Sequence, residues 1–213
     1  MIHFICSAPV EYQLPGFSLY ESFDLVSQGK RIARLKKNAA AYLEDFSFLF
    51  EIEKVQKVFT APSGQTYHTG KYLFALQITP AAELCQSKLL KSTRFRMSDV
   101  ISAQEFKKLG QRKALIKARR KFVEQLFDNR LPERKELLEK RIRQLLKQCV
   151  RQDQEILCIG HAFFLKILQG YLANPNIFTN RSAFVQAFEA TKRPFAPLQG
   201  FSVSAKTISR VLG

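Results

Sequence analysis

The sequence has few acidic residues, no tryptophan and no long apolar run. Its 213 residues include 18 Asp and Glu against 34 Lys and Arg, which gives a formal net charge of +16. Such an excess attracts nucleic acid, phospholipid head groups, acidic proteins or phosphorylated small molecules, and it says nothing about the fold. No run approaches the ~18 apolar residues of a membrane span. We therefore expect no transmembrane helix, and we expect the 19 Phe residues to fill the core.

Cysteine is also scarce, and none of the four Cys residues forms a C-x-x-C pair. That spacing gives no support to a zinc site or a thioredoxin-like redox site. Cys6 and Cys158 sit in apolar runs, so we expect buried free thiols there. The sequence indicates no metal ion and no cofactor. Its first residues lack a basic leader, and we expect a reducing, cytoplasmic setting.

Strand and helix patterns alternate along the chain. Apolar runs predict strands over 2–8, 57–61 and 155–159, and periodic segments predict helices over 27–50, 66–76, 103–127, 132–150 and 162–172. The stretch 84–100 is ambiguous, 184–191 reads as a short helix, and β-branched residues in 202–212 indicate a last strand. This alternation predicts an α/β fold, a three-layer α/β/α sandwich with a mostly parallel sheet. We expect one domain over 1–213, with a basic helical insertion at about 103–150.

Three loops are candidates for a functional site. They follow the three predicted strands at Cys6-Ser7-Ala8, at 61–65 and at Gly160-His161-Ala162. In α/β sheets, ligands bind beyond the carboxyl ends of the strands. The three loops should therefore meet at one site.

Four segments around these loops resemble the motifs of a known protein superfamily. They are Cys6-Ser7-Ala8 after the first strand, 25–33 with Gly29, 61–70 with Pro62 and Gln65, and His161 after the third strand. In the same order, histidine phosphatases of the phosphoglycerate-mutase-like superfamily have Arg-His-Gly, Leu-Thr-x-x-Gly-x-x-Gln-Ala, Ser-Pro-x-x-Arg-x-x-x-Thr-Ala, and a histidine between a strand and a helix. The sequence resembles that superfamily over most of its length, and least over about 84–131.

The resemblance implies a catalytic site in which most of the family's catalytic residues are replaced. Family enzymes attack a phosphoryl group with a histidine, hold its oxygens with two arginines and a second histidine, and protonate the leaving group with a carboxylate. Arginine suits this role because its planar fork binds phosphate in a bidentate manner. Here the nucleophile position holds Ser7, the arginine positions hold Cys6 and Gln65, and the acid position falls near Ser92. Only His161 keeps the family identity, which predicts a catalytically inactive protein that binds an anionic ligand or partner, with Ser7, Gln65 and His161 lining the pocket.

Other functions remain open for these residues. His161 is either a remnant of the ligand site, a general base for Ser7, or a structural residue at the start of a helix. A Ser7–His161 dyad would make the protein a phosphatase or another hydrolase with rebuilt chemistry, although no Asp is evident to orient the imidazole. A cysteine-phosphatase mechanism is excluded because neither Cys6 nor Cys158 is followed by the Cys-x5-Arg spacing. We assign no site role to His3 or His68.

The densest positive charge lies in the helix predicted over 103–127. Eight cations fall between Lys107 and Lys121 with no acidic residue between them. This face is either a solvated surface or a binding site for nucleic acid, an acidic protein or lipid head groups, with Lys113, Lys117, Arg120 and Lys121 as candidate contacts. The next predicted helix, over 132–150, mixes Glu with Lys and Arg, so we expect i,i+4 ion pairs within it to offset its positive charge.

Overall fold

The computed structural model describes residues 1–46, 52–62, 64–76, 82–189 and 195–213. Its centre is a five-stranded sheet with the order β5 (Glu83–Gln86), β4 (Lys57–Thr60), β6 (Ile156–Gly160), β1 (Ile2–Cys6) and β7 (Gly200–Val203). β5, β4, β6 and β1 run parallel, and β7 pairs antiparallel with β1. The mostly parallel sheet predicted from the alternating pattern is confirmed. A separate two-stranded ribbon joins β2 (Val10–Glu11) and β3 (Arg34–Leu35).

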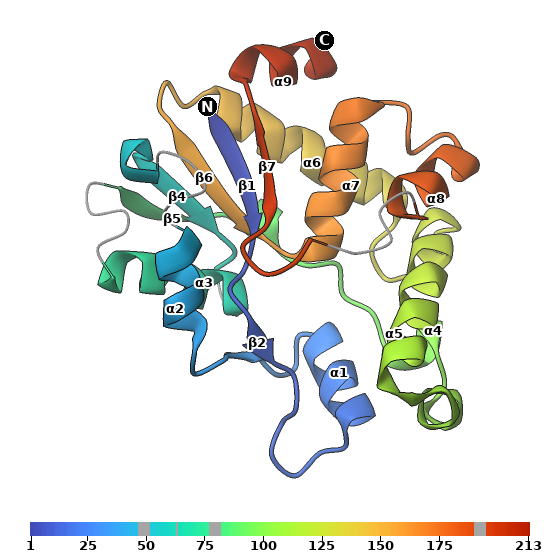
Figure 1. The fold of residues 1–213 in the computed structure, drawn as a ribbon. Helices are drawn as coiled ribbons and strands as arrows, with labels where there is room; N and C mark the ends of the chain where they lie inside the picture. The colour runs from blue at the N-terminus through green and yellow to red at the C-terminus, as the bar shows by residue number, and fades with distance from the viewer. Residues whose placement is uncertain (47–51, 63, 77–81, 190–194) are drawn as a thin grey trace.

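Helices surround the sheet (Figure 1). The described α-helices are α1 (Leu19–Ser27), α2 (Ala39–Phe46), α3 (Gln65–Ala75), α4 (Met97–Val100), α5 (Ala103–Phe127), α6 (Lys135–Val150), α7 (Ala162–Ala173), α8 (Arg181–Glu189) and α9 (Ala205–Leu212). Two short 3-10 turns, η1 (Ile52–Lys54) and η2 (Lys88–Leu90), complete the described elements. No described helix is long and apolar enough to cross a membrane.

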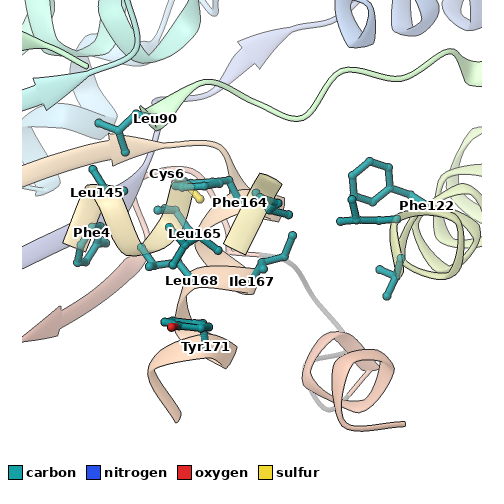
Figure 2. Close-up of a cluster of buried hydrophobic side chains, with 14 of the residues drawn as sticks. Phe4, Cys6, Leu90, Phe122, Leu145, Phe164, Leu165, Ile167, Leu168 and Tyr171 are labelled. Carbon is teal, nitrogen blue, oxygen red and sulfur yellow. The ribbon is translucent and has the colours of Figure 1, made fainter. Parts of the chain in front are cut away.

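The strands separate two apolar layers because successive side chains of a strand point to opposite faces. Phe4 of β1 and Cys158 of β6 join the larger cluster, which also holds Leu145 of α6 and Leu168 of α7. Figure 2 shows side chains of this cluster, with Phe4, Leu145 and the α7 residues Leu165 and Leu168 close together. On the other face, Ile5, Leu157 and Ile159 pack with Leu43 of α2 and Leu73 of α3. The chain therefore forms the expected three layers.

Several predicted elements differ from the observed ones. The helix predicted over 27–50 is wrong at its centre, because α1 ends at Ser27, Gly29 adopts a φ of 70° and β3 follows before α2. Residues 47–50 of that prediction lie outside the described residues. The last strand predicted over 202–212 is mostly helix, because β7 ends at Val203 and α9 begins at Ala205. The Ser204 side chain accepts a hydrogen bond from the Thr207 N–H at 3.1 Å and so caps α9.

Smaller differences affect the ends of three other elements. α6 begins at Lys135, three residues after the predicted Pro132. α8 covers Arg181–Glu189, whereas residues 190 and 191 of the predicted short helix lie outside the described residues. The ambiguous stretch 84–100 holds β5, η2 and α4, each too short to give a clear period.

Helix α5 has the predicted bounds but contains a sharp bend. Gly110 adopts φ 71° and ψ 159°, a backbone conformation that is essentially restricted to glycine. The bend lets the Lys117 ammonium form an ion pair with the Glu105 carboxylate, twelve residues earlier in the chain. In a straight helix these residues would be about 18 Å apart along the axis. The bend therefore brings an acidic group onto the basic helix.

Candidate functional site

The three loops that follow β1, β4 and β6 lie together at the carboxyl edge of the sheet. The Ser7 N–H donates to the Gly160 carbonyl at 3.2 Å, which joins the first loop to the third. The Ala8 N–H donates to Thr69 Oγ1 of α3 at 3.0 Å, and that hydroxyl donates to the Gln65 carbonyl at 2.8 Å. Gln65 and His161 then meet through their side chains. The loop 61–65 is described except for residue 63.

The contact between Gln65 and His161 is the centre of this site. Gln65 Nε2 lies 3.1 Å from His161 Nδ1, and the amide N–H donates to that ring nitrogen. Burial, with a smaller contribution from the positive charge of Arg141, lowers the pKa of His161 from 6.5 to about 4. A protonated imidazole would also place an N–H against the amide N–H of Gln65. His161 is therefore neutral at physiological pH, and its Nδ1 lone pair is already occupied.

Cys6 and Ser7 are the residues that the resemblance places at the family's first arginine and its nucleophile. Cys6 is buried, with its Sγ 3.9 Å from the Phe195 carbonyl, and burial raises the pKa of its thiol to about 12. A neutral thiol can neither clamp phosphate nor attack it. Ser7 is buried as well, and within the described residues no hydrogen bond joins its side chain to His161. Its hydroxyl thus lacks the contact with a base that would activate it.

Two further residues reach this site, and no sequence motif identifies them. The Tyr12 hydroxyl, just after β2, hydrogen-bonds with the Gln65 side chain, and its ring stacks on Phe23 at 4.8 Å between centroids. Arg119 of α5 lies near Tyr12 and is partly buried, whereas its neighbour Arg120 is exposed. Burial lowers the pKa of Arg119, while Tyr12 raises it. One cation of the basic helix therefore turns inward, toward the edge of the site.

Arg141 of α6 is the other cation that acts on the site, but it has a structural role. Its Nε and Nη2 each lie 2.8 Å from a Glu133 carboxylate oxygen, and its Nη1 donates to the carbonyls of Leu89 and Lys91. Thr93 Oγ1 donates to the same carboxylate at 2.6 Å. The guanidinium is thus already engaged on several sides. It lowers the pKa of His161 through its charge while its donors are used elsewhere.

The remaining candidate residues lie apart from this group. Ser92, at the expected acid position, is exposed, and within the described residues no hydrogen bond links it to Gln65 or His161. His68 is exposed on α3. His3 is buried in β1, where its ring nitrogens lie 2.7 Å from Ser202 Oγ and 2.8 Å from Glu155 Oε1. His3 thereby connects β7 to the start of β6. The described residues contain no group of His, Cys, Asp and Glu suited to a metal ion.

The four predicted contacts on α5 are exposed, and acidic neighbours offset three of them. Lys117 pairs with Glu105, and Glu124 pairs with both Arg120 and Lys121 at 3.6 and 3.4 Å. These acids lie just outside the stretch of eight cations, so the stretch looked unbroken in the sequence. The i,i+4 pairs expected within α6 are absent from the described ion pairs; Arg141 pairs with Glu133, ahead of the helix. Ion pairs therefore offset three of the eight cations of α5.

The sheet order, the two helical layers and the site at the carboxyl edge define a class of fold. The chain has the histidine phosphatase, or phosphoglycerate-mutase-like, fold. A mycobacterial glucosyl-3-phosphoglycerate phosphatase is similar with a TM-score of 0.56 and 12% identity, over 86% of this chain and 82% of that one. The protein titled mycobacterial hydrolase 2 has a TM-score of 0.56 and 11% identity, over 99% and 95%.

A third similar structure is YhfR of Bacillus stearothermophilus, with a TM-score of 0.54 and 14% identity over 81% of this chain and 79% of that one. The sequence itself matches no protein-family model and no curated protein. At these identities the structural comparison establishes the fold, and the function has to be argued from the site.

Proposed function

We propose that this protein is a catalytically inactive relative of the histidine phosphatases that binds an anionic ligand or partner without turning it over. The observation that supports the proposal is the neutral hydrogen-bonded pair of Gln65 and His161, two residues that the resemblance assigns to the phosphate-binding site. Phosphoryl transfer depends on fixed positive charge around a developing polyanion. Here the two arginine positions hold a neutral amide and a neutral thiol, and the retained histidine is uncharged.

Rebuilt chemistry with Ser7 and His161 is the competing function. A serine needs a base that accepts its proton within hydrogen-bond reach. His161 Nδ1 already accepts from Gln65, and a base with a pKa of about 4 is weak. Both observations weigh against a hydrolase that uses this pair. The same neutrality also argues that an anionic ligand binds mainly outside the pocket, where the excess positive charge lies.

The proposal predicts weak, unlocalised phosphate binding in the pocket. Inorganic phosphate titrated to tens of millimolar should leave the amide resonances of Ser7 and His161 almost unmoved. The variant Gln65→Arg is the control, because a guanidinium there restores one bidentate donor for phosphate. It should give a saturable shift at these amides, with a dissociation constant at least about tenfold lower than that of the wild type, since one charge-assisted bond contributes about 1.5–3 kcal/mol. Saturable submillimolar binding at Ser7 and His161 in the wild type would show that other cations replace the lost arginines.

A further inference from the structure

Four cations at the surface of α6 and its C-cap lie on one side of the helix. Lys140, Arg143, Lys147 and Arg151, here called the α6 stripe, follow one another at intervals of three, four and four residues, so they share one side of the helix. Within the described chain, no ion pair involves any of these four residues. On α5, by comparison, Glu105 and Glu124 engage three of the eight cations.

The acidic residues of α6 leave the stripe open. Glu136 accepts two hydrogen bonds from Asn129 Nδ2, both at 3.1 Å. A hydrogen bond from its own backbone N–H, and then the bonds from Asn129, lower the pKa of its carboxyl. Glu136 and Glu139 both belong to the first half of the helix. The second half carries only cations and amides on its exposed side. Positive side chains near a helix C-terminus also interact favourably with the helix dipole, so the arrangement is stable without a partner.

Amide side chains run beside the cations. Gln144, Gln148 and Gln152 follow Lys140 at four-residue intervals, next to the row of Arg143, Lys147 and Arg151. An open hollow of about 380 Å³ lies between the two rows, lined by Gln144, Lys147, Gln148, Arg151 and Gln152 and by no acidic residue. A second hollow of about 410 Å³ continues toward Lys140 and Arg143, and Glu136 and Glu139 line its far side. Only the first hollow, at the C-terminal half of the helix, is lined by cationic and amide donors alone.

Several of these side chains are held in place. Arg143 donates to the Tyr171 hydroxyl at 3.0 Å and to the Leu212 carbonyl of α9 at 3.2 Å. Gln148 Oε1 accepts from Ser87 Oγ at 3.0 Å, and Gln152 Oε1 accepts from Lys57 Nζ at 2.9 Å. A surface fixed in this way loses less side-chain entropy when it binds a ligand.

We propose that the α6 stripe binds the phosphate backbone of double-stranded nucleic acid without reading its sequence. From Lys140 to Arg151 the helix rises about 17 Å. Phosphates of one duplex strand follow one another at about 3.4 Å along the axis, so the stripe can run beside about five of them. Lys, Arg and Gln are side chains that commonly contact phosphate oxygens.

The surface fits other polyanions less well. The α6 and α9 sequences contain no aromatic residue, so these helices offer no platform on which single-stranded bases could stack. The apolar side of α6, with Leu138, Ile142 and Leu145, is buried in the core and cannot insert into a lipid surface. One large apolar side chain of α6, Leu137, is exposed one turn before Lys140, and a single leucine is not the apolar core on which protein interfaces usually depend.

This surface is separate from the site formed by Gln65 and His161. The second half of α6 leads into the start of β6, at the amino edge of the sheet, whereas Gln65 and His161 lie at the carboxyl edge. In Figure 1, α6 and α9 lie toward the top, near the N-terminus. The inference therefore does not depend on whether the pocket is catalytically inactive.

The test compares two variants that remove equal charge from the two helices. The α6 variant is Lys140→Gln with Lys147→Gln and Arg151→Gln, and the control is Lys113→Gln with Lys117→Gln and Lys121→Gln on α5. All six residues are exposed, and each variant lowers the net charge by three. Binding to a mixed-sequence 20-base-pair duplex is measured by fluorescence anisotropy across a salt series. The corresponding single strand and phosphatidylserine vesicles are measured in parallel.

We expect wild-type binding to the duplex with a dissociation constant of roughly 10⁻⁴–10⁻⁶ M at physiological salt. The α6 variant should lower the salt slope by about 3 and the affinity by at least about tenfold, since each phosphate contact contributes about 0.9 to the slope. The α5 control should stay within about threefold of the wild type. Equal weakening by both variants, a larger effect of the α5 variant, or no duplex binding would overturn the proposal. Tighter binding to single strands or to the vesicles would overturn it too.

Discussion

Replacing Gln65 with glutamate should raise the pKa of His161 from about 4 to between roughly 5 and 7. The amide of Gln65 now donates to Nδ1, which favours the neutral ring, whereas a carboxylate would accept a hydrogen bond from a protonated Nδ1. Gln65→Met is the matched control, because it removes the donor without adding charge and should keep the pKa low. The measurement is a pH titration of the His161 ring resonances. An unchanged pKa in Gln65→Glu would show that the two side chains are not in contact.

The lowered pKa of His161 makes the stability of the fold depend on pH. Because the pKa of His161 is lower in the folded state than the unfolded value of 6.5, its neutral form stabilises the fold above pH 6.5. That contribution falls as the pH decreases from 6.5 to about 4, by up to about 3 kcal/mol. Gln65→Glu should reduce this loss, because it brings the pKa of His161 in the folded state closer to the unfolded value. Urea unfolding at pH 7 and pH 4.5, with wild type and both variants, measures the effect.

Replacing Arg141 with alanine should lower the free energy of unfolding by about 3–5 kcal/mol. The Arg141 and Glu133 side chains are 13% and 21% exposed, so removal of the guanidinium leaves a largely buried carboxylate without its cation. The carbonyls of Leu89 and Lys91 also lose a donor, and the contact of the guanidinium with the Phe164 ring, at 4.7 Å, disappears. The measurement is denaturant unfolding at pH 7.

Two further variants make this result specific. Lys140→Ala removes an exposed cation of the same helix and should change the stability by no more than about 0.5 kcal/mol. Arg141→Met combined with Glu133→Leu removes both charges and should recover part of the loss, since a buried pair can often be replaced by apolar residues. A loss below about 1 kcal/mol for Arg141→Ala would mean that the pair is solvated and does not hold η2 to α6.

The sequence predicted the parts of the fold that depend on local patterns. The apolar runs that became β1, β4 and β6 identify the centre of the sheet, and the residues after these strands lie together as Ser7, Gln65 and His161. The ordered resemblance of those segments predicted the histidine phosphatase fold, which is confirmed. Short elements were missed, as in β7 and α9, because four residues of strand followed by eight of helix give no clear period.

The electrostatics of the molecule could not be predicted in the same way. Tyr12 and Arg119 reach the site only because β2 and α5 fold toward it, which no spacing reveals. Glu105 reaches Lys117 across the bend at Gly110, and Arg141 takes Glu133 as its partner. Ion pairs depend on tertiary structure, so the run of charge that looks densest in the sequence need not be the one that stays unpaired.

The central claim is that the pocket carries out no phosphoryl transfer. Its most direct test is the hydrolysis of a generic aryl phosphate by the wild type and by the variants His161→Ala and Ser7→Ala. In active enzymes, the loss of one oxyanion contact alone costs about 10²–10³ in rate. Because the resemblance places Ser7, Cys6 and Gln65 at the nucleophile and the two arginine positions, we expect all three proteins to hydrolyse the substrate at the rate of buffer alone. A wild-type rate well above that background, lost in His161→Ala, would contradict the account.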